Sequence, residues 1–186
     1  MNKSIFLLSV FLFALFALVD LQSCKSTGSS ANVGGGSINW MTFEEAMAAA
    51  DRNPKKIFVD VYTDWCGWCK EMDKTTFRDK KVADYINQNF YPVKFDGEYK
   101  GTVRYLDRKW NFVKQRSTGY HELAEMMLDG RLEYPAYVLF SEEKKRVQVL
   151  PGYMDVNTMS MYLKYFAEDH YQRTPLQAFE RSFRGL

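Results

Sequence analysis

A pair of cysteines that directly follows a buried strand restricts the fold of this chain more than any other feature. Lys56–Tyr62 (KIFVDVY) is rich in β-branched and aromatic residues, which predicts a strand. Cys66 and Cys69 come next, in the run WCGWCK, and the sequence from Cys66 to about Lys74 favours a helix. A strand that leads into a helix places Cys66 at the helix N-terminus, where free N–H groups and the helix dipole favour a thiolate.

The spacing also predicts the roles of the two sulfurs. Cys69 lies one helical turn after Cys66 on the same face. It can therefore attack a mixed disulfide formed at Cys66 and release the partner. We expect Cys66 to be the more exposed of the two. A structural zinc site needs four ligands, but no second C-x-x-C is present and His121 and His170 are distant in sequence. We predict neither a metal nor a cofactor.

Composition indicates a single globular domain with additional segments. The chain has 186 residues, of which 46% are hydrophobic, enough for a substantial core. Its 25 basic and 23 acidic residues nearly balance, and no dense basic block is present. The sequence therefore gives no support for nucleic-acid binding.

Helical and strand patterns alternate through the rest of the chain. A capping box, Thr42 with Glu45, begins the first predicted helix, which extends to about Arg52. Further helices are predicted at 80–89, 120–129 and 155–169, and further strands at 91–96, 136–140 and 146–150. This order predicts a mixed α/β domain with a central sheet.

The run VDVYTDWCGWCK resembles the active-site region of thioredoxins. Asp60 lies where these proteins carry a buried acid that acts as proton acceptor for the resolving cysteine, and burial would raise its pKa. Lys94 matches the lysine beside that acid. Pro135 precedes the strand AYVLF, as the cis proline of the family does. The resemblance implies a thioredoxin fold, with Cys66, Cys69, Asp60 and Lys94 as catalytic residues.

The same resemblance implies a substrate-binding surface around the cysteines. Its predicted members are Trp65, Gly67, Trp68, Tyr134 and Pro135. The backbone of the residue before the cis proline would pair with an extended substrate segment. Trp68 departs from the Gly-Pro pair between the cysteines of typical thioredoxins. The longer run TDWCGWCKEMDKTTFRD is similar to the periplasmic thioredoxin-like domain of transmembrane thiol:disulfide interchange proteins.

One segment departs from the thioredoxin pattern. The stretch between Lys94 and Pro135 is longer than its counterpart in thioredoxins, and the excess falls at about 97–118. Apolar residues alternate there around a polar turn, which predicts a single β-hairpin insertion. The insertion is either a flap for partner recognition or a loop that packs on the core.

The beginning of the chain resembles an export signal. Residues 1–23 contain a basic start and an apolar run too short for a comfortable membrane span, which fits a signal peptide. Cys24 follows in the manner of a bacterial lipoprotein signal, which implies lipidation at Cys24. An ordinary signal peptide cut near Ser23, or a retained signal anchor, remains an alternative. We predict a flexible linker over 24–37, the thioredoxin-like domain over 38–171 and a tail over 172–186.

The leading hypothesis is an enzyme that exchanges disulfides with cysteine-containing exported proteins in the cell envelope or periplasm, preferably as a reductase. That direction requires a membrane protein as electron donor. Two alternatives stay open at this stage. Cys66 and Cys69 could hold copper(I), which prefers soft thiolates, or the chain could be a thioredoxin-fold binding module whose cysteines are incidental.

Overall fold

The computed structural model describes residues 36–186. The predicted signal peptide, Cys24 and most of the predicted linker lie outside the described residues. Within residues 36–186, no helix combines the length and the apolar character that crossing a membrane requires.

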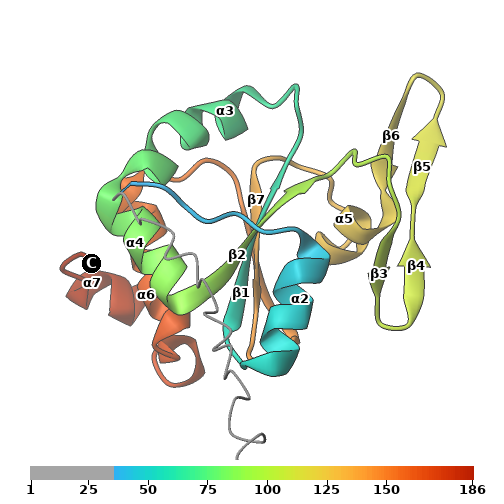
Figure 1. Ribbon diagram of the computed structural model, residues 1–186. Coiled ribbons are helices and arrows are strands. Elements are labelled where there is room, and N and C mark those ends of the chain that lie inside the picture. Colours follow the sequence, from blue (N-terminus) through green and yellow to red (C-terminus); the bar gives the residue numbers. More distant parts are fainter. Residues whose placement is uncertain (1–35) are drawn as a thin grey trace, which may run out of the picture. The chain divides into compact units, whose positions relative to one another are not determined.

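A four-stranded mixed sheet forms the centre of the domain (Figure 1). Its strand order is β2-β1-β7-β8. Strand β1 runs parallel to β2 and antiparallel to β7, which pairs antiparallel with β8. The sheet strands are β1 (Lys56–Tyr62), β2 (Phe90–Asp96), β7 (Ala136–Phe140) and β8 (Arg146–Pro151). Every residue of β7 is buried, as expected of an inner strand covered on both faces.

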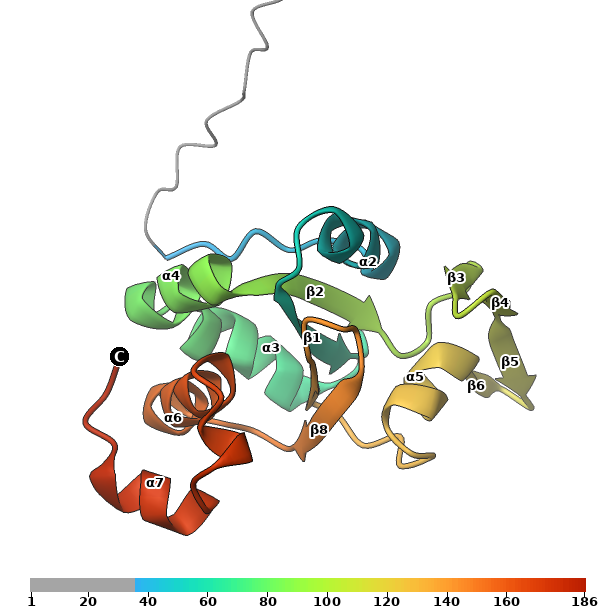
Figure 2. The same ribbon diagram turned by 90° about the horizontal axis from the view of Figure 1, so that it is seen from below.

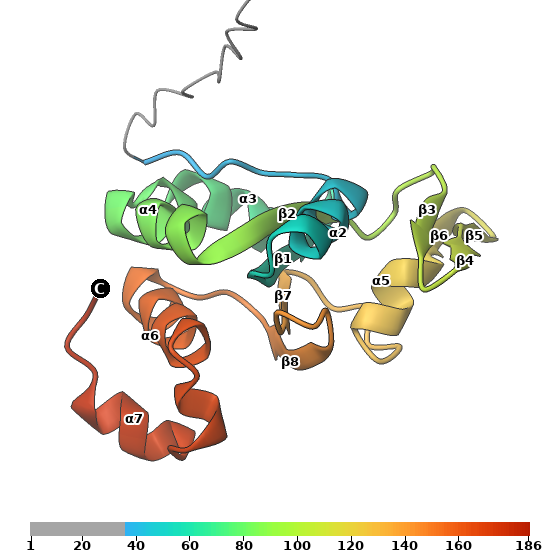
Figure 3. The ribbon, with the colours of Figure 1, turned by 60° about the horizontal axis from the view of Figure 1, so that its bottom comes forward.

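Helices cover both faces of this sheet (Figures 1 and 2). Buried side chains of α3, α4 and α6 pack on one face, and those of α2 and α5 pack on the other. Helix α7 lies beyond α6, on the side away from the sheet (Figure 3). The helices are α2 (Phe43–Arg52), α3 (Gly67–Lys74), α4 (Lys80–Asn89), α5 (Glu122–Met127), α6 (Val156–Ala167) and α7 (Leu176–Ser182). Short 3-10 turns occupy Thr76–Arg78 and His170–Gln172.

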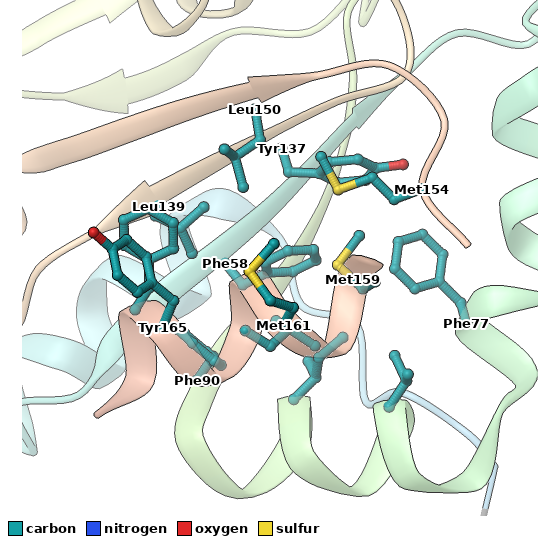
Figure 4. Close-up of a cluster of buried hydrophobic side chains, with 14 of the residues drawn as sticks. Phe58, Phe77, Phe90, Tyr137, Leu139, Leu150, Met154, Met159, Met161 and Tyr165 are labelled. Atoms are coloured by element: carbon teal, nitrogen blue, oxygen red, sulfur yellow. The ribbon is translucent and has the colours of Figure 1, made fainter. Parts of the chain in front are cut away.

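Large rings and methionines fill the layer between the sheet and α6 (Figure 4). The ring of Tyr137 on β7 stacks on that of Phe58 on β1, with centroids 5.7 Å apart and planes 12° apart. Met159 is fully buried beside them. Because side chains alternate between the two faces of a strand, Asp60, two residues after Phe58, points into this same layer. The position of Asp60 is important for the site described below.

Local sequence signals explain several element boundaries. The Thr42 side chain accepts the N–H of Glu45, and the Glu45 carboxylate accepts the N–H of Thr42, so the predicted capping box is formed. Asp79 caps α4 by accepting the N–H groups of Lys81 and Val82. The central mixed sheet flanked by helices confirms the predicted fold class.

The insertion differs from the single hairpin that the sequence predicts. It forms two successive two-stranded hairpins, seen on the right of Figure 1. The first pairs β3 (Val103–Tyr105) with β4 (Arg108–Trp110), and the second pairs β5 (Phe112–Gln115) with β6 (Thr118–His121). Because β6 occupies residues 118–121, α5 begins at Glu122 instead of at the predicted residue 120.

The first hairpin packs on the core. Val103 and Trp110 pair directly across it, and both are buried in the cluster that contains α2. The ring of Tyr105 meets that of Phe43 edge to face, 5.1 Å away. Most side chains of the second hairpin remain exposed or half-buried. Of the two alternatives for the insertion, core packing therefore describes its first hairpin.

Candidate active site

Cys66 and Cys69 are joined by a disulfide at the N-terminus of α3, with their Cα atoms 5.3 Å apart. Cys66 is the N-cap residue of this helix, and its sulfur accepts the N–H of Cys69 at 3.0 Å. A sulfur that receives a backbone N–H at a helix start is well placed to become a stabilised thiolate after reduction.

The two cysteines are almost equally buried in the disulfide form. Cys66 is 4% exposed and Cys69 is 3% exposed. These exposures of whole residues do not separate the two sulfur atoms, so the greater exposure of the Cys66 sulfur stays a prediction.

Asp60 and Lys94 form an ion pair in the layer between the sheet and α3. The two residues are direct partners in the register of β1 and β2. Lys94 Nζ donates to Asp60 Oδ2 at 3.1 Å, and Asp60 is only 2% exposed. Asp60 Oδ1 has no hydrogen-bond partner among the described residues. Burial raises the pKa of Asp60 to about 6, although the Lys94 ammonium opposes this shift.

Lys94 also pairs with a second acid, Asp73 on α3. Burial lowers the pKa of Lys94, but the carboxylates of Asp60 and Asp73 together outweigh this effect and raise it. The Asp73 charge in turn contributes to the raised pKa of Asp60. The Lys94 ammonium therefore forms ion pairs with two carboxylates, that of the buried Asp60 on β1 and that of Asp73 on α3.

Tyr134 and Pro135 lie on the loop that precedes β7, and the peptide bond between them is cis, as predicted. Pro135 is buried, and its carbonyl accepts the N–H of Gly152 at 2.8 Å. The Tyr134 ring meets the Trp65 ring edge to face, with centroids 5.8 Å apart. Trp65 is 65% exposed and its indole N–H donates to Glu98 Oε1 at 3.0 Å. Most of the Trp65 side chain is therefore open to solvent.

On the other flank, Trp68 is 62% exposed. Its ring packs against that of Tyr153, with centroids 5.1 Å apart. Gly67, Trp68, Glu71 and Tyr153 line an open hollow of about 460 Å³. A Cβ atom at Gly67 would meet no atom within 4 Å, so this position borders open space. The disulfide thus lies between two exposed tryptophan rings.

The structure joins Cys66 to Cys69, Asp60 to Lys94 and Trp65 to Tyr134, and it adds three residues that the sequence reasoning missed. These are Asp73, Glu98 and Tyr153. The spacing of four residues from Cys69 to Asp73 was a usable signal, because it places both on one face of a helix. Glu98 and Tyr153 approach the site only through tertiary contacts, so no local pattern marks them.

No group of three or more His, Cys, Asp and Glu side chains within residues 36–186 is arranged to hold a metal ion. The arrangement instead offers a cysteine pair that can cycle between dithiol and disulfide. It also contains a buried acid, Asp60, whose pKa of about 6 permits proton uptake near neutral pH. Exposed tryptophan rings directly adjoin the two cysteines in the sequence.

The fold and the site define a thioredoxin-fold protein of the thiol–disulfide oxidoreductase class. Residues 31–168 match the model of the Thioredox_DsbH family, which is described as "Protein of unknown function, DUF255". The chain belongs to this family. The redox assignment therefore depends on the geometry of the site and not on the family description.

Solved structures of other proteins share the fold. A thioredoxin-fold protein from Helicobacter pylori superposes with a TM-score of 0.55 at 21% identity, covering 70% of this chain and 84% of that one. A thioredoxin from Thermus thermophilus gives a TM-score of 0.50 at 15% identity, covering 74% of this chain and 91% of the other. At such identities the likeness concerns the fold alone.

A curated relative is similar around the cysteines. The thiol:disulfide interchange protein DsbD of Pseudoalteromonas atlantica is 43% identical over 49 residues, which are 26% of this chain. The match spans only 8% of that relative's length. The matched region is therefore a small part of that relative.

Proposed function

We propose that this protein carries out thiol–disulfide exchange on exported proteins, with reduction of partner disulfides as its preferred direction. The observation that carries the proposal is the Cys66–Cys69 pair at the N-terminus of α3, the helix whose Asp73 shares Lys94 with the buried Asp60. The similarity of the cysteine region to a thiol:disulfide interchange protein supports it.

The reaction follows from the positions of the two sulfurs. In the reduced protein, the Cys66 thiolate attacks one sulfur of a partner disulfide and expels the other partner sulfur as a thiolate. Cys69 then loses its proton and attacks the Cys66 sulfur, which forms the Cys66–Cys69 disulfide and releases the second partner thiolate. Two electrons pass from the protein dithiol to the partner disulfide, and the two partner thiolates take up protons.

Asp60 is the proposed proton acceptor for Cys69, through a water molecule. A carboxylate with a pKa of about 6 is ionised at pH 7 but retains enough basicity to accept a proton. Lys94 keeps this charge in place, because its ammonium is within hydrogen-bond distance of Asp60 Oδ2. Asp60 is buried, so partners do not need to contact it.

Partners are proposed to bind along the Tyr134–Pro135 loop. Within the described residues, the Tyr134 N–H and C=O form no hydrogen bond, so both are free to pair with an extended segment. Trp65, Gly67 and Trp68 border the same opening and would contact residues on either side of the partner cysteine.

The location of the protein is part of this proposal. Residues 1–23 would be removed as a signal peptide, Cys24 would carry the lipid, and 24–37 would link the membrane to a domain at 38–171 followed by a tail at 172–186. A reductase outside the cytoplasm must be reduced again after each turnover. We therefore include a membrane electron-donor protein, whose dithiol would transfer two electrons to the Cys66–Cys69 disulfide.

The reduction potential of the Cys66–Cys69 pair, measured by equilibration in glutathione buffers, tests the proposed direction. We expect a reduction potential near that of thioredoxin, about −270 mV, which would mark the protein as a general reductant. A value near about −120 mV would mean that the protein forms disulfides instead. A pair that never cycles would exclude the enzyme altogether.

A trapping experiment in the native host tests the partners. Cys69→Ser should accumulate mixed disulfides through Cys66, because the resolving attack is lost. Cys66→Ser is the matched control and should accumulate none. Identification of exported proteins in the trapped complexes is the expected result, whereas equal trapping by both variants would contradict the assigned roles.

A labelling experiment tests the lipid anchor separately. The protein should incorporate labelled palmitate, and Cys24→Ala should abolish this incorporation.

A further inference from the structure

The surface around the disulfide has an uneven charge. Three carboxylates, those of Asp64, Asp96 and Glu98, cluster on the Trp65 side, and we call them the acidic rim. Glu98 accepts the indole N–H of Trp65, and the Glu98 N–H donates to Asp96 Oδ1 at 2.9 Å. Asp64 immediately precedes Trp65 and is exposed.

The three charges of the acidic rim act on one another and on their surroundings. Burial, with the charges of Asp64 and Glu98, raises the pKa of Asp96. Burial, with the charges of Glu98 and Asp96, raises the pKa of Tyr134 to about 12. These effects agree with the contacts and place the rim beside both Trp65 and the loop before β7.

The rim is not neutralised from within the described part of the chain. No lysine, arginine or histidine nitrogen there lies within 4.0 Å of its carboxylates. Lys100 is close enough to oppose the raised pKa of Asp96, but its ammonium lies over the Phe112 ring, 3.4 Å from the centroid. Lys70 follows Cys69 on α3. Because successive residues of a helix are about 100° apart, Lys70 lies about 200° around the axis from Trp68, on the opposite side of the helix.

An exposed indole ring next to carboxylates that form no ion pair within the described residues matches one chemistry. A tryptophan face attracts an ammonium or guanidinium group, and a neighbouring carboxylate adds a charge-assisted hydrogen bond. An acidic partner, a nucleic acid or an anionic lipid surface would be repelled by the same carboxylates. On the opposite flank, the hollow beside Trp68 and Tyr153 is aromatic and fits an apolar side chain.

We propose that the protein selects partner segments in which a lysine or arginine flanks the reacting cysteine, with the cation held by the face of the Trp65 ring and the carboxylates of the acidic rim. This inference rests on the proposed function, because the cysteine of the segment must reach Cys66. It adds a chemical preference among partners, which disulfide exchange alone does not require.

Peptide disulfides test the preference. Three disulfide-linked peptide dimers of one sequence carry Arg, Gln or Glu two residues from the cysteine. The rate of their reduction by the full reduced protein is divided by the rate with dithiothreitol, which removes the intrinsic effect of the charge on the disulfide. We expect the corrected rates to fall in the order Arg, Gln, Glu, with about threefold per step at low salt. The differences should shrink at 0.5 M salt, because exposed charges are screened.

Variants connect the preference to the acidic rim. Glu98→Gln should lower the Arg-to-Glu ratio of corrected rates by about threefold, the effect of one exposed charge pair. Glu142→Gln makes the same charge change in the turn between β7 and β8, at the end of β7 away from Pro135, and should leave the ratio unaltered.

The outcomes separate this inference from the function that it refines. Equal corrected rates for the three peptides, with the Gln peptide reduced efficiently, would overturn the charge preference and leave the reductase standing. A faster reaction with the Glu peptide would also overturn it. Failure to reduce any peptide, by a protein whose cysteines still cycle with dithiothreitol, would overturn both.

Discussion

Lys94 Nζ lies 3.1 Å from Asp60 Oδ2, which pairs a cation on β2 with a buried acid on β1 beneath the redox-active helix. The pairing offsets only part of the cost of burying Asp60, because Lys94 divides its charge between Asp60 and Asp73. The pKa of Asp60 therefore remains raised, to about 6.

Asp60→Asn is expected to stabilise the protein at pH 8 and not at pH 4. The folded pKa of Asp60 lies above its ordinary value of 3.8, so ionisation destabilises the fold increasingly as pH rises from about 4 to above 6. At about 1.4 kcal/mol per pKa unit, the gain at pH 8 is about 3 kcal/mol. Urea unfolding at both pH values measures it. An equal gain at pH 4 would contradict the raised pKa.

Asp73→Asn is expected to lower the pKa of Asp60. The variant removes a negative charge that raises this pKa, and it leaves the Lys94 ammonium to Asp60 alone. Carbon-13 NMR titration of the aspartate carboxyls would follow the change directly. The acid limb of the rate of disulfide exchange should move to lower pH in the same direction. Glu142→Gln, which lies outside this network, is the control, and an unchanged Asp60 titration in Asp73→Asn would refute the coupling.

The strands and longer helices could be predicted closely because each carries its own local signal. Lys56–Tyr62 and Lys80–Asn89 have the predicted bounds, the first from its β-branched residues and the second from its apolar spacing and its Asp79 cap. The two hairpins of the insertion could not be separated. Their turns place Leu106, Asp107 and Arg116 at positive φ (53°, 55° and 50°), where glycine or asparagine would have marked them.

The site was predictable where chemistry is local and not where it depends on packing. The spacing and position of Cys66 and Cys69 indicated a redox pair, and the structure joins them by a disulfide. The position of Trp65 depends instead on contacts with Tyr134 and Glu98, which are distant in sequence. Sequence alone therefore predicted Trp65 as part of the site but not these two contacts of its ring.

Gly97→Ala is expected to act through Tyr134. A Cβ atom at residue 97 would lie 2.3 Å from the Tyr134 hydroxyl oxygen, so the Tyr134 ring must move away from its place beside Trp65. The second-order rate with a protein disulfide should fall. In a Tyr134→Ala background, Gly97→Ala should cost almost nothing, giving a coupling energy of about 1 kcal/mol. Additive losses in the double variant would show that Gly97 acts by another route.

His121 is expected to make stability fall in mild acid. Its side chain is fully buried, Nδ1 accepts the N–H of Leu123 at 3.1 Å, and Nε2 has no hydrogen-bond partner among the described residues. Burial lowers the pKa of His121, although the nearby backbone of Gly101 and then the charges of Glu122 and Glu44 oppose this. Protonation would therefore add a buried charge and remove the acceptor that caps α5.

The sign of the effect follows from the lowered pKa. The unfolded chain binds the proton at about pH 6.5, before the folded protein does, so the contribution of His121 to stability is complete above that pH and is lost below it.

The variant His121→Asn tests this effect, because it keeps an N-cap acceptor but has no group that titrates. The difference in unfolding free energy between the original protein and this variant should shrink from pH 7.5 to pH 5, which isolates His121 from the opposing effect of Asp60. A pH-independent difference for His121→Asn would mean that the buried imidazole does not resist protonation.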